Sequence, residues 1–566
     1  MFCLCFVIFV FFVVRKLAIL LNWGFPDNHP IKSYLLARMN WEISYMTQSF
    51  PSIFNDVIGP VMRGPSSSHC AASLRIGRLA RDLMDGRIDE VLIEFDPNGS
   101  LASTHISQGS DMGLFGGFLG WEAHDERLVN AAREIQQAGI KSRIKIEDYG
   151  ADHPNTYRIS LQNKTDAHQL IALSTGGGMV EIVEIDNVPV SIAGDYFETL
   201  VFITGKDEAI LGRIQEKFSA ESYKLCSGID TGFIEIKSRE FPNDNVCGAI
   251  EAMPEVAGIK KLAPVLPVLS RKEVSVPFIT CEQMLQFSTG QTRELWELAR
   301  IYESARAGIS EKEVLDKMGA IVRIMRNSVR QGIAGTRFDD RILGHQSGGF
   351  HQQMNANRLL DGGMLNRMIL YTSAMMEVKS AMGVVVAAPT AGSCGTLPGA
   401  CLGAADFMGL EGTEIARALL AAGLIGVFIA ARSTFAAEEA GCQAECGVAS
   451  GMAAAALVSL AKGSLLQAVC ASSMALQNIL GMVCDPVANR VEVPCLGKNV
   501  MAVSNALSCA NMALAGFDQV IPLDEVIAAM DAVGRSIPRE LRCTALGGLS
   551  ATRTAREIDK KLSVRG

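Results

Sequence analysis

The stretch GMAAAALVSLAKGSLLQAVCASSMALQNILGMVC, residues 451–484, is apolar on nearly every helical face and rich in small side chains. The stretch ARALLAAGLIGVFIAAR at 416–432 has the same character. A helix that is apolar all round lies inside a bundle. Strand patterns end near Phe278, and Ala, Gly and Met are frequent from there onward. We therefore predict an all-α domain over residues 279–560.

A membrane-spanning bundle is the alternative interpretation of these apolar helices. The segment between Arg417 and Arg432 has 14 residues, whereas a bilayer span requires about 20 apolar residues. The later stretch carries Ser, Gln and Asn along its length. Because polar side chains at membrane depth are costly, we expect no membrane insertion of this domain.

Upstream of the helical region, strand and helix patterns are mixed. VLIEFD at 91–96 and TYRISLQN at 156–163 have strand character, and RLVNAAREIQQAG at 127–139 has helical periodicity. Residues 46–192 are therefore expected to form an α+β domain. Residues 193–272 give the order strand, helix, two strands, helix, strand, which is the ferredoxin-like βαββαβ arrangement.

The βαββαβ segment resembles an ACT domain, a regulatory module that often binds amino acids between subunits. ACT domains usually carry Pro-Gly at the start of the first helix, where this chain has Glu208 and Ala209. The resemblance implies regulation by an amino acid and leaves the effector open.

The first 22 residues, MFCLCFVIFVFFVVRKLAILLN, form an apolar run that Arg15 and Lys16 interrupt after 14 residues. That run is too short for a bilayer span. Its charges follow the apolar stretch, whereas in a signal peptide they precede it. Met46 opens a sequence of soluble character, so we expect residues 1–45 to be an extension outside the fold. A membrane anchor is the alternative.

The overall charge argues against one class of partner. Charged residues make up 20% of the chain, the net charge is -8 and the pI is about 5.7, which offers no basic patch for phosphate groups. Nucleic acid is therefore not an expected partner. Fifteen cysteines without a CxxC pair suit a reducing compartment. We expect a cytoplasmic protein in which some thiols are available as ligands.

Three cysteines of the helical region lie beside turn-forming residues: Cys442 in EEAGCQAECG, Cys484 in GMVCDPVANR and Cys495 in VEVPCLGKN. Glycine and proline near the thiols would let the three loops converge. Iron–sulfur clusters require thiolate ligands, and three of them would leave one iron of a four-iron cluster open as a Lewis acid. Structural burial is the alternative, because free cysteine is among the most buried residue types.

Two loops offer polar groups. In GPSSSH at 64–69, three hydroxyls and the imidazole of His69 would lie on an exposed turn, where they could hold a carboxylate and accept a proton. In APTAGSCGTLPGA at 388–400, Pro and Gly interrupt the helix, so the loop would present backbone N–H groups to an anion. A Ser-rich surface turn and a plain helix connection are the respective alternatives.

The three cysteine segments, separated by 42 and 11 residues, resemble the cluster-ligand segments of the iron–sulfur L-serine dehydratases. GPSSSH, HPNTYRISL at 153–161 and STGGGMVEIVEI at 174–185 resemble the beta-part signatures of that family. The helical region resembles its alpha part. The resemblance extends from about Ile53 to Glu557 and implies a single chain in which beta and alpha parts are fused.

The resemblance implies a specific site. A [4Fe-4S] cluster would be held by Cys442, Cys484 and Cys495. His69 would be the catalytic base, assisted by Ser67 and Ser68. The expected substrate-binding residues are Ser66, Thr390, Gly392, Ser393, Asn499 and Arg542.

The implied reaction is elimination of water from L-serine to give pyruvate and ammonia, in amino-acid catabolism and gluconeogenesis, by a homodimer. L-cysteine desulfidation or L-threonine dehydration on the same scaffold is an alternative, as is a non-catalytic amino-acid sensor. His345 is a second acid–base candidate. Cys70 stands where the family usually has threonine, and Cys543 is the nearest candidate for the C-terminal cysteine that caps the open iron in relatives.

Overall fold

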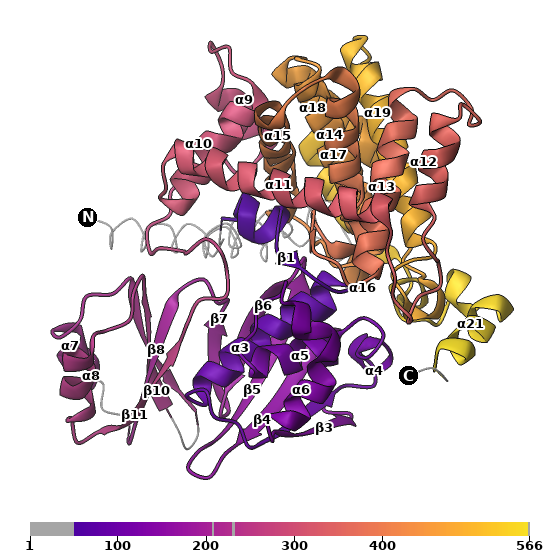
Figure 1. The fold of residues 1–566 in the computed structure, drawn as a ribbon. Coiled ribbons are helices and arrows are strands. Elements are labelled where there is room, and N and C mark those ends of the chain that lie inside the picture. The colour runs from indigo at the N-terminus through magenta and orange to yellow at the C-terminus, as the bar shows by residue number, and fades with distance from the viewer. Residues whose placement is uncertain (1–49, 206–208, 229–231, 564–566) are drawn as a thin grey trace, which may run out of the picture. The chain divides into compact units, whose positions relative to one another are not determined.

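The computed structural model describes residues 50–205, 209–228 and 232–563 (Figure 1). The chain from Pro51 onward clusters as one compact unit. The predicted extension, residues 1–45, lies outside the described residues.

The first part of the fold is a six-stranded sheet with the order β3-β2-β4-β5-β6-β7. Neighbouring strands are antiparallel except for the parallel pair β2–β3. Helices α3 (Ala72–Leu83), α5 (Ser110–Phe118) and α6 (Ala131–Gln137) cover one face (Figure 1). The strands are β2 (Glu90–Phe95), β3 (Lys141–Ile146), β4 (Thr156–Gln162), β5 (Ala167–Gly176), β6 (Met179–Ile185) and β7 (Val188–Ile192).

The next segment has the predicted βαββαβ order. Its elements are β8 (Phe197–Ile203), α7 (Ala209–Gln215), β9 (Ser222–Ser227), β10 (Gly232–Ser238), α8 (Asp244–Glu251) and β11 (Val256–Leu262). The antiparallel sheet has the order β11-β8-β10-β9. Its core contains Val201, Ile210, Ile234, Ile236 and Ile250. Alternate apolar residues on β8 and β10 thus face the two helices, as a half-buried sheet requires.

The rest of the described chain is almost entirely helical. Its helices are α9 (Cys281–Phe287), α10 (Leu295–Ala307), α11 (Glu311–Ala334), α12 (Ser347–Asn355), α13 (Met364–Ser380), α14 (Thr396–Met408), α15 (Gly412–Ala430), α16 (Ala437–Ala440), α17 (Cys446–Leu460), α18 (Leu465–Gln477), α19 (Cys495–Leu514), α20 (Leu523–Ser536) and α21 (Arg553–Ser563). Every residue of α17 is buried, which confirms the predicted burial of the apolar helices. The predicted fold class, an α+β region followed by a helical one, is confirmed.

One strand interrupts the helical part, contrary to the expectation that strands end near Phe278. The two-residue strand β12 (Val385–Val386) pairs with β1 (Val61–Met62) of the first part. Such a short pairing leaves no periodic signal in the sequence.

Two helical segments in the described part of the chain are long and apolar enough to cross a bilayer, Gly412–Ala430 and Cys442–Leu460. Most of each segment is buried inside the protein. Core helices of water-soluble bundles have this same property.

Residues 51–58, here called the junction segment, join the first part to the helices. They contain a short helical turn, η1 (Ile53–Val57), which packs against α15 and buries Ile53 and Val57. Ser52 Oγ donates a hydrogen bond to Glu303 on α10 at 2.5 Å, and the Ile53 N–H donates to the same carboxylate at 2.8 Å. The segment therefore fixes the start of the α+β part on the helical part.

Candidate active site

The GPSSSH loop forms the turn η2 (Ser67–Ala71), which leads into α3. Ser66 caps the turn, because its Oγ accepts the His69 N–H at 3.3 Å. Ser66, Ser67, Ser68 and His69 are all buried. The predicted exposed tip is therefore wrong. The turn docks on the helical part, where the Ala391 N–H donates to Ser67 Oγ at 3.2 Å, and sequence patterns do not report such long-range docking.

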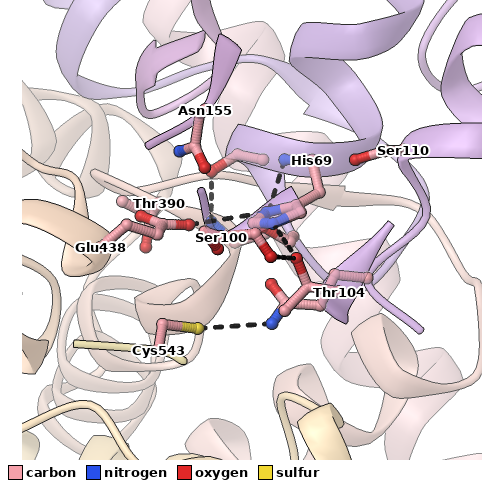
Figure 2. A network of polar contacts seen from close by, with 12 residues as sticks. His69, Ser100, Thr104, Ser110, Asn155, Thr390, Glu438 and Cys543 are labelled. Atoms are coloured by element: carbon pink, nitrogen blue, oxygen red, sulfur yellow. Dashed lines mark hydrogen bonds and ion pairs between the residues drawn. The ribbon is translucent and has the colours of Figure 1, made fainter. Parts of the chain in front are cut away.

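Both ring nitrogens of His69 have partners. Thr104 Oγ1 donates to the Ser100 carbonyl at 2.7 Å, so its oxygen accepts a hydrogen bond from His69 Nε2 at 2.8 Å. In this tautomer Nε2 carries the proton. The lone pair of Nδ1 then faces Ser66 Oγ at 3.1 Å and Glu438 Oε1 at 3.5 Å. Figure 2 shows His69 between Thr104 and Glu438.

Burial moves the pKa values of His69 and Glu438 in opposite directions. It lowers the pKa of His69 to about 3, with a smaller contribution from His105. It raises the pKa of Glu438, on α16, to about 7, assisted by the charge of Glu445. Near neutral pH the imidazole is therefore uncharged, and Glu438 can either hold or release a proton beside Nδ1.

The loop at 388–400 forms the turn η4 (Ala391–Ser393) before α14. Thr390 and Ser393 are buried, and Thr390 Oγ1 donates to Glu445 Oε1 at 2.6 Å. A Cβ on Gly392 would lie 2.6 Å from that same carboxylate oxygen, so a side chain at this position would displace Glu445. Thr390 and Gly392 thus adjoin the partly buried carboxylate of Glu445, and Ser393 Oγ lies 3.2 Å from Thr390 Oγ1.

Asn499 and Arg542 are anchored by other parts of the protein. The Asn499 amide nitrogen donates to the carbonyls of Gly392 at 2.8 Å and Cys495 at 2.9 Å, and its oxygen accepts from both donors of Thr396. Asn499 therefore ties the 388–400 loop to α19. Arg542 Nη1 donates to the Glu439 carbonyl at 2.9 Å. Substrate binding by either residue stays a prediction.

The helical part brings several thiols together. One ligand atom from each of Cys442, Glu445 and Cys484 lies within 4.8 Å of the others. Cys442, Cys484 and Cys543 form one buried cluster, and backbone hydrogen bonds join Cys484 to Cys543 at 2.9 Å and to Leu541 at 2.8 Å. Cys495 begins α19 and is buried.

The surroundings of the thiols fit a cofactor that is bound by thiolates. Burial raises the pKa of Cys495, and the charge of Cys442 adds to this effect. Two lysine side chains partly offset this rise in the pKa of Cys495. Lys498 Nζ donates to the Val483 carbonyl at 2.7 Å, and although burial lowers its pKa, Cys442, Asp485 and Cys484 together raise it above the usual value. Lys379 is fully buried, donates to the Val491 carbonyl and also lowers the pKa of Cys495. Soft donors with nearby cations suit an iron–sulfur cluster.

Some functional side chains were missed from the sequence. Glu438 and Glu445 had a signal, because both stand in the EEAGCQAE segment around Cys442, but a run of acidic residues is equally typical of a solvated helix face. Lys498 also had a signal, because it follows Cys495 by three residues. Thr104 and Lys379 had no pattern that predicts this site. Their places follow from long-range packing.

Three further side chains, His345, Cys394 and Cys70, have partners other than Thr104 and Glu438. His345 Nε2 bonds the Gly332 carbonyl at 3.0 Å, and its side chain is partly exposed. Cys394 is buried against Met376. Cys70 is buried below Gly64, whose φ of +107° and closeness to the thiol leave no room for a side chain.

Known proteins with similar sequences share both parts of the chain. Residues 290–550 match the family described as "Serine dehydratase alpha chain". The chain is 38% identical to the L-serine dehydratase of Helicobacter pylori (strain ATCC 700392 / 26695) over 505 residues, which cover 86% of this chain and 96% of the relative. The chain therefore belongs to the L-serine dehydratase family, a family of lyases.

Two relatives from Bacillus subtilis (strain 168) match the parts separately. The probable L-serine dehydratase alpha chain is 38% identical over 253 residues, 45% of this chain and 84% of the relative. The probable beta chain is 31% identical over 220 residues, 38% of this chain and 99% of the relative. The predicted fusion of beta and alpha regions in a single chain is thus confirmed.

Proposed function

We propose that this chain is an iron–sulfur L-serine dehydratase, which eliminates water from L-serine to give pyruvate and ammonia. One observation carries the proposal: the His69–Glu438 pair and the buried thiols meet at the junction of the two parts. Gln108 of the beta-type part donates to Cys543 Sγ at 3.3 Å, and Glu438 lies four residues before Cys442 in the sequence.

The reaction needs assistance at both ends of the substrate, because the α-proton of serine is weakly acidic and hydroxide is a poor leaving group. Glu438 has a pKa raised to about 7 by burial, which is close to the optimum for a general base at neutral pH. Its neighbour His69 is neutral and presents the Nδ1 lone pair to it. The pair is therefore suited to accept the α-proton, and Thr104 holds the imidazole in the required orientation.

The finer cofactor assignment is a [4Fe-4S] cluster held by Cys442, Cys484 and Cys495. Such a cluster would supply a Lewis acid that assists the departure of hydroxide. Support comes from the burial of the three thiols and from the cations of Lys379 and Lys498 close to them. The 388–400 loop, with Thr390, Gly392 and Ser393, is assigned to the substrate carboxylate.

The decisive experiment measures pyruvate and ammonia after anaerobic incubation of the iron-loaded protein with L-serine. The same assay with L-cysteine and L-threonine, scored for sulfide and 2-oxobutanoate, defines the substrate. His69→Ala should retain iron and lose about 10²- to 10⁴-fold in turnover, the range for a positioned acid–base group. His345→Ala is the matched control and should retain turnover. The reverse result would transfer the role to His345.

A homodimer and a cytoplasmic location stay predictions. Light scattering of the purified protein and fractionation of cells that express it test them directly.

A further inference from the structure

Three buried side chains of the beta-type part carry polar atoms without a hydrogen-bond partner of standard geometry among the described residues. These atoms are Ser100 Oγ, Ser174 Oγ and both polar atoms of the Asn155 amide, although the Asn155 amide lies close enough to Glu438 to oppose the rise that burial causes in the pKa of that carboxyl. Asn155 and Ser174 are 0% exposed and Ser100 is 2% exposed. Leaving buried polar atoms unsatisfied is costly, and each such group calls for an explanation.

The three residues belong to one place. The Ser100 N–H donates to the Pro154 carbonyl at 2.8 Å, and the Ser174 N–H donates to the Asn155 carbonyl at 3.1 Å. The Asn155 amide adjoins Glu438, and Figure 2 shows Ser100, Asn155 and Glu438 around His69. The Ser100 and Asn155 side chains therefore border the candidate active site, and Ser174 is joined to Asn155 through the backbone.

The charged groups around the candidate active site are unevenly distributed. The charged side chain beside Asn155 is the carboxylate of Glu438, and the unpartnered atoms are an amide and hydroxyl groups that can accept hydrogen bonds. The cations of Lys379 and Lys498 interact instead with the thiols. An amino acid bound between Glu438 and the thiols would direct its ammonium group to Asn155 and Glu438, and its carboxylate away from them.

We propose that Asn155, with Ser100 and Ser174, binds the α-ammonium group of the substrate beside Glu438. The assignment rests on the proposed function, since it specifies how the same site orients L-serine. It makes the site selective for α-amino acids over carboxylic acids of the same shape. With the ammonium group held there, the adjacent α-carbon lies next to the His69–Glu438 pair.

L-alanine and propanoate test the proposal, because they differ in the α-ammonium group and neither can lose water. Their dissociation constants are measured by anaerobic calorimetry on the intact iron-loaded protein. Asn155→Ala should weaken L-alanine binding by about 10-fold or more, as expected for loss of a hydrogen bond to a charged group, and leave propanoate binding unchanged. Ser174→Ala should change the ratio of the L-alanine to the propanoate dissociation constant in the same direction.

Ser160→Ala is the matched control. Ser160 lies on β4 and its Oγ already accepts a bond from Gln169 at 3.0 Å, so the ratio of the two constants should stay at the wild-type value. Equal weakening of both ligands in Asn155→Ala and Ser174→Ala would show a structural role and overturn the proposal. An unchanged ratio in both variants would overturn it as well. If Asn155→Ala does not fold, the ratio of the two dissociation constants in Ser174→Ala tests the proposal on its own.

The proposed function can fail separately. A wild-type protein that binds L-alanine with the predicted selectivity but forms no pyruvate from L-serine would contradict the dehydratase assignment and leave the ammonium site standing. Pyruvate formation with an unaltered ratio in the variants would contradict the ammonium site alone.

Discussion

At the scale of single residues, the thiols in the described part of the chain differ in environment, although all of them except Cys470 are buried. Cys484 adjoins both Cys442 and Cys543, and Cys495 is close enough to Cys442 for their charges to interact. Cys394 instead packs against Met376. Because these environments differ, single substitutions can separate ligands from structural thiols.

We expect Cys442→Ser, Cys484→Ser and Cys495→Ser each to lose bound iron, because a hydroxyl is a poor substitute for a soft thiolate. Cys394→Ser, the buried control, should retain it, and so should Cys543→Ser if three thiolates suffice. Iron and sulfide are quantified per chain after anaerobic purification. Iron lost in Cys543→Ser but kept in Cys495→Ser would instead select Cys442, Cys484 and Cys543 as the ligands.

A second residue-scale prediction concerns the buried carboxylate of Glu198 on β8. Burial raises its pKa to about 8, against the opposing charge of Lys237. The folded state therefore binds a proton that the unfolded chain releases at lower pH, and this group costs stability as pH rises from about 4.5 to about 8. Glu198→Gln should flatten the fall in melting temperature over that interval. Glu240→Gln, at an exposed neighbour, should keep the wild-type slope.

At the scale of elements, the sequence correctly predicts the helices and strands whose residue pattern lies within one segment. The βαββαβ order and the buried helix α17 were foreseen because alternation and all-round apolar character can be recognised within one segment. The burial of Ser66–His69 was not foreseen, since the loop is polar and its cover comes from residues more than 300 positions away. For the same reason, His69 was found from a motif, whereas no local pattern marks Glu438 as a buried partner of His69.

Helix α11 offers an element-scale test of close packing. A Cβ on Gly332 would collide with the backbone of Ala374 on α13, whereas a Cβ on Gly319 of the same helix would meet just the end of Arg323 at 3.9 Å. Gly332→Ala should therefore destabilise the fold by about 1–3 kcal/mol, the usual cost of overpacking. Gly319→Ala should stabilise it by about 0.5–1 kcal/mol through helix propensity. Denaturant unfolding of both variants measures the difference, and equal values would contradict the described α11–α13 contact.

At the scale of the whole described unit, the chemistry depends on contacts between its two parts. Ser67 meets the 388–400 loop, His69 faces Glu438, and Gln108 reaches Cys543. The junction segment lies at the start of the first part, with Ile53 and Val57 packed against α15. The proton-transfer pair is thus divided between the two parts, with His69 in the first part and Glu438 in the helical part beside the cysteines. The relative position of the two parts should therefore control turnover separately from iron binding.

Gly426→Val tests this dependence. A Cβ on Gly426 of α15 would collide with Val57 of the junction segment, whereas Gly412 of the same helix has nothing within 4 Å of that position. Overpacking at Gly426 should cost about 1–3 kcal/mol and displace the junction segment, which separates His69 from Glu438. Turnover should therefore fall while iron per chain stays near wild type, since Cys442, Cys484 and Cys495 all lie in the helical part. Gly412→Val should preserve both quantities. Normal turnover in a measurably destabilised Gly426→Val protein would show that other contacts between the two parts hold the site in register.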